Sequence, residues 1–255
     1  MTVGELYKKL DELYPTSQSC PWDNDGRMVV PDGNREVKKV LCCLDVDTAV
    51  VKRAILQGVD LIVSHHPLIF RPLKALDSAD PAAAKALCLY SAGIAVFSFH
   101  TRFDCGVNGI NELLAAAFEM TDVRAWILEG LPMGRIGELP EEMSGREFAA
   151  LVKQRLGCEA LRFVNPEKRV RTVALVGGSG GSYFKEAIAE GADAFLTGEA
   201  SHHQLLDAGE AGLCLIAAGH DYTERAAARS FCATLNGIDP ALELICCDGI
   251  ALETL

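Results

Sequence analysis

The sequence has no apolar run of the roughly 18 to 20 residues that are needed to cross a bilayer. Its first residues, Met1 to Leu6, also lack the basic segment and apolar core of a secretory signal. We therefore expect a cytoplasmic protein with no membrane partner.

Positive charge is scarce. The chain carries 24 Lys and Arg against 35 Asp and Glu, which gives a formal net charge of −11 spread along its 255 residues. A protein that binds the phosphate backbone of nucleic acids needs a basic face. The composition therefore argues against a nucleic-acid partner.

Disulfide and thiolate-metal motifs are also missing. Ten cysteines are present, but none of them forms a C-x-x-C pair. Cys42-Cys43 and Cys246-Cys247 lie within apolar, strand-like runs, and the others are scattered. In a chain of this length without a secretory signal, this arrangement predicts reduced thiols that serve mostly as small core residues.

What the sequence does contain is an alternation of short apolar strands and amphipathic helices. Apolar residues make up 49% of the chain, and strands that alternate with helices predict an α/β fold with a largely parallel sheet. Expected helices cover 2–13, 45–58, 81–91 and 108–118, and expected strands cover 37–44, 61–64 and 94–99. The Gly- and Pro-rich stretch 122–142 is predicted to be a connector.

The second half repeats the pattern of the first. A capping box at Ser144 and Glu147 mirrors the one at Thr2 and Glu5. The segment A-I-x-x-G-x-D recurs at an offset of 133 residues, ending at Asp60 and again at Asp193. We interpret the chain as two similar α/β lobes, 1–125 and 126–255, that arose by internal duplication and share a site in the cleft between them.

Histidines and carboxylates follow the expected strands in both halves. His65 and His66 end the strand at 61–64, and His66 precedes a proline that keeps its backbone extended. Open α/β sheets place their ligands at the carboxyl ends of strands. The polar residues at these ends are His65, His66, His100 and Asp104 in the first half, and His220 and Glu224 in the second.

Imidazoles combined with carboxylates suit Zn, Fe, Mn or Ni and are poor ligands for Ca or Mg alone. A single catalytic metal usually keeps three protein ligands, so five or six ligands are too many for one ion. They fit two ions about 3.5 to 4 Å apart that share a carboxylate and a water, as in two-metal hydrolases.

The same residues, in order and spacing, resemble the NIF-three-like family, also named GTP cyclohydrolase 1 type 2 homologues. The resemblance covers nearly the whole chain. It is carried by Asp60 to Phe70, Ser98-Phe99-His100-x-x-x-Asp104, Thr197-Gly198-Glu199 with His203, Gly219-His220-x-x-x-Glu224, Trp22-Asp23-Asn24-x-Gly26 and Gly134-Arg135-Ile136-Gly137-Glu138-Leu139.

The resemblance implies a toroidal homohexamer with a dinuclear metal centre in each subunit. The metal ligands that it implies are His65, His66, Asp104, His220 and Glu224. It places His100 and His203 in the same site as candidate catalytic residues that move protons, whereas His202 is more consistent with an exposed helix position.

The resemblance further implies a hydrolase that uses a metal-bridging water, with GTP, a related nucleotide or a cyclic amide as the candidate substrate. The alternative is a non-enzymatic metal-binding ring that stores metal, delivers it or acts as a regulatory scaffold. Metal-dependent turnover distinguishes the two.

Four features stay open at the level of sequence. The Gly177–Gly181 stretch could hold a phosphate or could form a tight strand-to-helix turn. Arg102 and Asp221 depart from the family pattern, and Arg102 is either an anion clamp or a salt-bridge partner. The Trp22-Asp23-Asn24 segment either approaches the metal site or contains a buried tryptophan with capping side chains.

Overall fold

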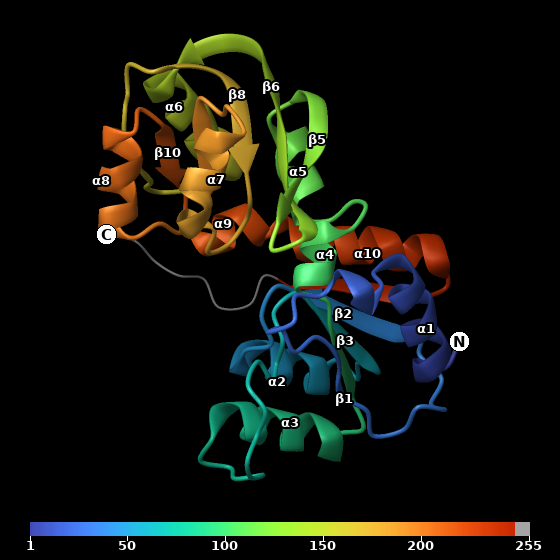
Figure 1. Cartoon of the computed structure of the whole chain (residues 1–255). Coiled ribbons are helices and arrows are strands. Elements are labelled where there is room, and N and C mark those ends of the chain that lie inside the picture. The colour runs from blue at the N-terminus through green and yellow to red at the C-terminus, as the bar shows by residue number, and fades with distance from the viewer. Residues whose placement is uncertain (248–255) are drawn as a thin grey trace. The chain divides into compact units, whose positions relative to one another are not determined.

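Apolar runs of four or five residues form the centre of the first of two sheets in the computed structural model, which describes residues 1–247 (Figure 1). β2 (Lys39–Cys43), β3 (Leu61–Ser64) and β4 (Ala95–Ser98) run parallel, with β11 (Glu243–Cys247) parallel to β2 and β1 (Gly26–Val29) antiparallel to β4. The strand order is β1-β4-β3-β2-β11. Every residue of β3 and β4 is buried, as expected of parallel strands covered on both faces.

Helices cover both faces of this sheet. Leu41, Ile62 and Val96 pack on one face against Val50 of α2 and Leu89 of α3. On the other face α10 contacts β2, β3 and β11. The helices of this unit are α1 (Val3–Leu13), η1 (Thr16–Gln18), α2 (Thr48–Leu56), α3 (Pro81–Ser91), α4 (Thr101–Cys105) and α10 (Ala226–Ile238).

The second sheet has six strands in the order β5-β6-β8-β9-β10-β7. Its parallel centre consists of β8 (Arg169–Leu175), β9 (Ala194–Thr197) and β10 (Cys214–Ala217), and β7 (Arg162–Phe163) is antiparallel to β10. The helices of this unit are α5 (Ile110–Ala117), α6 (Gly145–Leu156), η2 (Gly181–Tyr183), α7 (Phe184–Ala189), α8 (His202–Glu210) and α9 (His220–Glu224).

The stretch 122–142 is not a connector, so that prediction was wrong. It forms a long antiparallel hairpin of β5 (Thr121–Leu128) and β6 (Leu131–Ser144). Glu129 and Gly130 both have positive φ at the turn, which matches the twist of a two-residue hairpin. Position 134 of β6 requires glycine, because a Cβ there would lie 2.6 Å from the Trp126 ring. Pro140 falls where the pairing of β6 with β8 shifts register, so no ladder hydrogen bond needs its missing N–H.

The fold is α/β with two similar lobes and parallel strands at the centre of each sheet, as predicted. The two compact units are 1–107 with 226–247, and 108–225, whereas the predicted lobes were 1–125 and 126–255. The difference at the carboxyl end has a simple cause. β11 pairs with β2, and this pairing includes the last helix and strand in the first unit.

Equivalent hydrogen bonds support the duplication. The Asp60 carboxylate accepts from the backbone N–H groups of Lys38 and Lys39, and the Asp193 carboxylate accepts from those of Arg171 and Thr172. Each aspartate directly precedes one strand and ties it to the backbone of the preceding strand in the sheet. Both predicted capping boxes, at the starts of α1 and α6, are present.

Within residues 1–247 none of the ten cysteines forms a disulfide, and seven of them are buried. Among these residues no helix combines the length and the apolar character that a membrane span needs.

Candidate metal centre

Three histidines follow neighbouring parallel strands of the first unit. His65 and His66 come directly after β3, and His100 comes two residues after β4. The backbone N–H groups of His65 and His66 donate to Cys43 and Leu44, at the end of the adjacent β2. These bonds fix the turn, so the imidazoles lie at the carboxyl edge of the sheet as predicted.

Each of these imidazoles is anchored through its Nδ1 atom. The Nδ1 of buried His65 lies 2.9 Å from the carbonyl oxygen of Phe99, which can only accept. The Nδ1 of His66 lies 2.8 Å from Asp45. Hydrogen bonding at Nδ1 to such acceptors fixes the proton there and makes Nε2 the ligand atom of a neutral imidazole.

His100 is anchored by Asp23, which lies in the segment whose role stayed open in the sequence. The Nδ1 of His100 is 2.9 Å from Asp23 Oδ1, and Asp23 Oδ2 accepts from the backbone and hydroxyl of Thr101. Burial alone would raise the pKa of Asp23, but the hydrogen bonds from His100 and Thr101 outweigh it and lower this pKa to about 2. The neighbouring Trp22 is exposed rather than buried, with its ring beside His100 and Phe70.

The three imidazoles are close enough to share an ion. One ring nitrogen each from His65, His66 and His100 can be chosen so that all lie within 4.8 Å of one another. Asp104, on α4, places Oδ1 at 3.7 Å from the Nε2 of His65. The first unit therefore gathers two imidazole donors, His65 and His66, and the Asp104 carboxylate, a set that fits a borderline divalent ion such as zinc or iron, and places His100 beside them.

In the second unit His220 and Glu224 lie together on α9. The Nε2 of His220 is 3.1 Å from Glu224 Oε2, and its Nδ1 is 3.2 Å from Glu199 Oε1. The helix begins at His220 itself and keeps the two side chains one turn apart. A carboxylate at Nδ1 and a second carboxylate beside Nε2 repeat the anchored-ligand pattern of the first unit.

The Gly177-Gly178 part of the glycine-rich stretch supports Glu224. Gly178 has φ +63°, and a Cβ there would lie 2.3 Å from Glu224 Oε1. Its N–H donates to Thr223 Oγ1, while the N–H of Gly177 donates to Asn111. These two glycines therefore form a tight turn that leaves room for the buried Glu224 carboxylate. Of the two alternatives for the stretch, the tight turn holds at Gly177 and Gly178.

Two residues left open by the sequence form ion pairs. Arg102 is not an anion clamp, because its fully buried guanidinium contacts Asp11 at 2.6 Å and Asp25 at 3.1 Å. Asp221 pairs with Arg225 at 2.8 Å on the surface of α9.

His202 and His203 lie in the exposed first turn of α8, where the His203 ring contacts the Ser201 hydroxyl at 3.0 Å. The structure thus agrees with the exposed position expected for His202. It places His203 in the second unit with His220, and His100 in the first unit with His65 and His66.

Sequence reasoning missed the residues that anchor the ligands. Asp45 comes two residues after β2, just as His66 comes two residues after β3, and this position was a signal that could have been used. Glu199 lies 133 residues after His66, so the duplication could also have identified it. Nothing local marked Asp23 as the partner of His100, because the two are 77 residues apart.

These features define a class of protein with two α/β lobes, each carrying histidines and carboxylates at the carboxyl ends of parallel strands. The chain belongs to the Duf34/NIF3 (NGG1p interacting factor 3) family, whose model matches residues 1–249.

Curated relatives and solved structures agree with this membership. The "GTP cyclohydrolase 1 type 2 homolog" of Lactococcus lactis is 32% identical and aligns with 96% of this chain and 95% of its own length. "Protein NIF3 homolog" of Schizosaccharomyces pombe is 33% identical over 87% of this chain and 84% of its own length. The crystal structure of Staphylococcus aureus hypothetical protein SA1388 superposes with a TM-score of 0.90 at 25% identity, covering 100% of this chain and 99% of that one.

Proposed function

We propose that the protein is a hydrolase that depends on two divalent transition metal ions, held by His65, His66, Asp104, His220 and Glu224. The observation that carries this proposal is the shared anchoring of the histidines. Three of these ligands are imidazoles, and each has a carbonyl or carboxylate oxygen at Nδ1, which leaves Nε2 for a metal. The two acidic ligands each lie beside one of these Nε2 atoms.

Chain connectivity supports a joint role for the two clusters. The chain passes from the first unit to the second after residue 107, three residues beyond Asp104. It returns after residue 225, the residue that follows Glu224. Both carboxylates thus lie next to the points where the chain passes between the units, and the family resemblance assigns both to the same metal centre. Five ligands suit two ions better than one.

Bound divalent ions supply Lewis acidity, which activates water and polarises a carbonyl or phosphoryl oxygen. The chain itself supplies the proton chemistry. In the Asp23–His100 pair the carboxylate holds the proton at Nδ1 and leaves Nε2 to accept a proton from water and pass it to a leaving group. His203 is the corresponding candidate in the second unit. Trp22 and Phe70 place apolar ring faces beside His100, where they can exclude water.

The name "GTP cyclohydrolase 1 type 2 homolog" suggests GTP, and we include related nucleotides and cyclic amides among the candidate substrates. We further infer a cytoplasmic homohexamer, on the strength of the family resemblance. The metal is one of Zn, Fe, Mn and Ni, since the same nitrogen and oxygen donors suit all four.

The function is tested by restoring each of these four metals to the purified protein and measuring turnover of nucleotides, phosphoesters and cyclic amides. We expect hydrolysis with at least one metal, and we expect His100→Gln to reduce kcat by about 10²- to 10⁴-fold without loss of metal. His202→Gln, a change of an exposed histidine outside the cluster, should leave kcat unchanged. Stable metal binding without any turnover would instead favour a metal-storage or regulatory ring.

A further inference from the structure

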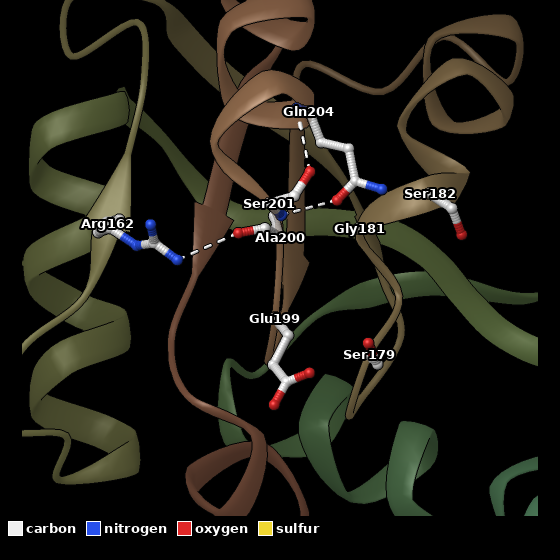
Figure 2. Close-up of a pocket in the computed structure, with 8 residues that line it drawn as sticks. All are labelled: Arg162, Ser179, Gly181, Ser182, Glu199, Ala200, Ser201 and Gln204. Carbon is white, nitrogen blue, oxygen red and sulfur yellow. Dashed lines mark hydrogen bonds between the residues drawn. The ribbon is translucent and has the colours of Figure 1, made fainter.

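A pocket of about 560 Å³ in the second unit has no part in the chemistry described so far (Figure 2). It lies at the carboxyl end of β9, between the loop that follows β8 and the start of α8. No aromatic side chain lines it within the described part of the chain, so it offers no stacking surface for a flat ring. Its lining residues are Arg162, Ser179, Gly181, Ser182, Glu199, Ala200, Ser201 and Gln204.

The amide of Gln204 is held in one orientation. Its Oε1 accepts from the backbone N–H of Ser201 at 2.8 Å, and the Ser201 hydroxyl accepts from the backbone of Gln204, which completes a capping box. The amide oxygen is therefore used by the helix. Figure 2 shows the NH₂ group of Gln204 directed away from Ser201, toward Ser182. The two N–H groups of the Gln204 amide thus face the pocket in a fixed direction.

The glycine-rich loop approaches this amide closely. A Cβ on Gly181 would lie 2.7 Å from Gln204 Oε1 and 2.7 Å from the carbonyl oxygen of Glu199, so only glycine fits. The close approach brings the exposed hydroxyls of Ser179 and Ser182 to the pocket wall. Both hydroxyls can donate.

Arg162 adds positive charge to the opposite wall. It lies on β7, which pairs with β10, and its Nη2 donates to the carbonyl oxygen of Ala200 at 3.1 Å. This bond holds one side of the guanidinium and leaves the remaining N–H groups available for a ligand.

The pocket is polarised. Figure 2 shows Ser182, Ser201 and Gln204 near one end, and Glu199 and Ser179 toward the other. Glu199 also contacts the Nδ1 of His220 at 3.2 Å, so the carboxylate end of the pocket adjoins a proposed metal ligand.

We propose that the end formed by Gln204, Ser182 and Arg162 binds a phosphate group that anchors the substrate without reacting. Amide, hydroxyl and guanidinium donors match phosphate oxygens, and Arg forms strong charge-assisted bonds to them. The rest of the ligand then extends past Glu199 to His220. The phosphate site stands by itself, whereas the identification of its ligand as a substrate rests on the proposed function.

The test is isothermal titration of the full-length protein with inorganic phosphate. Gln204→Glu keeps the capping box, because Glu and Gln both serve at this position, but it replaces the NH₂ donor with a charged oxygen. We expect at least a tenfold loss of phosphate affinity. Glu147→Gln makes the reverse exchange in the capping box of α6 and should leave phosphate binding unchanged.

A third variant, Glu224→Gln, distinguishes phosphate that binds in the pocket from phosphate that binds to a metal ion, because this change impairs the proposed metal site. We expect it to bind phosphate like the wild type. Phosphate binding that disappears in Glu224→Gln and survives in Gln204→Glu would overturn the proposal, as would an absence of phosphate binding in the wild type. A wild-type protein that binds phosphate but no metal would refute the proposed function and leave the phosphate site intact.

Discussion

His66→Ala is expected to lower the metal content from two ions per chain to one or none. Loss of a residue that only orients a ligand costs about 10- to 100-fold in metal affinity, and loss of the ligand itself should cost more. The side chain of His66 is 21% exposed, so its removal leaves no large cavity and the fold should persist. Metal analysis of the purified variant after dialysis measures the effect.

The matched control for this variant is His202→Ala, which removes an exposed histidine from α8. It should retain the full metal content. If His66→Ala also retained both ions, His66 would not be a ligand, and the assignment of the adjacent histidines to metal would be refuted.

Arg102→Met should reduce the free energy of unfolding by about 3 to 5 kcal/mol, since breaking a buried ion pair leaves a charge without compensation. Asp25, the partner left behind, is only 4% exposed at its side chain. Burial raises the pKa of Asp25, and the nearby Arg102 charge opposes that rise. Without Arg102 the carboxylate must be buried alone or take up a proton. Urea unfolding monitored by circular dichroism measures the loss.

Arg225→Met provides the comparison, because Arg225 pairs with Asp221 on the surface. Exposed pairs contribute about 0 to 1 kcal/mol, so this change should be nearly neutral. The double variant Arg102→Met with Asp25→Asn should recover part of the stability by removing the buried charge. A loss below 1 kcal/mol in Arg102→Met alone would show that the ion pair is not structural.

Local patterns predicted most of the fold. The bounds of β3 and α3 follow directly from an apolar run and from a Pro-initiated helix. The hairpin at β5 and β6 was missed because glycine and proline usually interrupt strands. Here Gly134 admits the Trp126 ring, and Pro140 lies at a register shift. Such reasons depend on a neighbouring strand and cannot be seen in the strand itself.

The positions of the candidate ligands at strand ends were predictable from the sequence, and the residues that hydrogen-bond to them were much less so. His65, His66 and His100 stand at strand ends, and the topology brings strand ends together. Of the partners of their Nδ1 atoms, Asp45 could have been found from its position after β2, whereas no local pattern marks Asp23 as the partner of His100. The sequence left Arg102 open between an anion clamp and a salt-bridge partner, and the structure shows the second, with the guanidinium buried against Asp11 and Asp25.

A comparison of equivalent positions in the two halves shows that the two units are chemically unequal. Asp104 and Glu224 each lie four residues after a histidine, but the adjacent histidines after β3 correspond to Gly198 and Glu199 after β9. The first unit thus offers more imidazoles. The second offers a carboxylate cluster and, next to it, the polar pocket lined by Gln204.

X-ray absorption spectroscopy on the metal-loaded protein tests the central claim most directly. If ligands from both units hold two ions together, the spectrum should show nitrogen and oxygen neighbours and a metal–metal scattering path at about 3.5 to 4 Å. That path should vanish in both His66→Ala and Glu224→Gln. Two bound ions without a metal–metal path, or a path that persists in either variant, would contradict a shared dinuclear site.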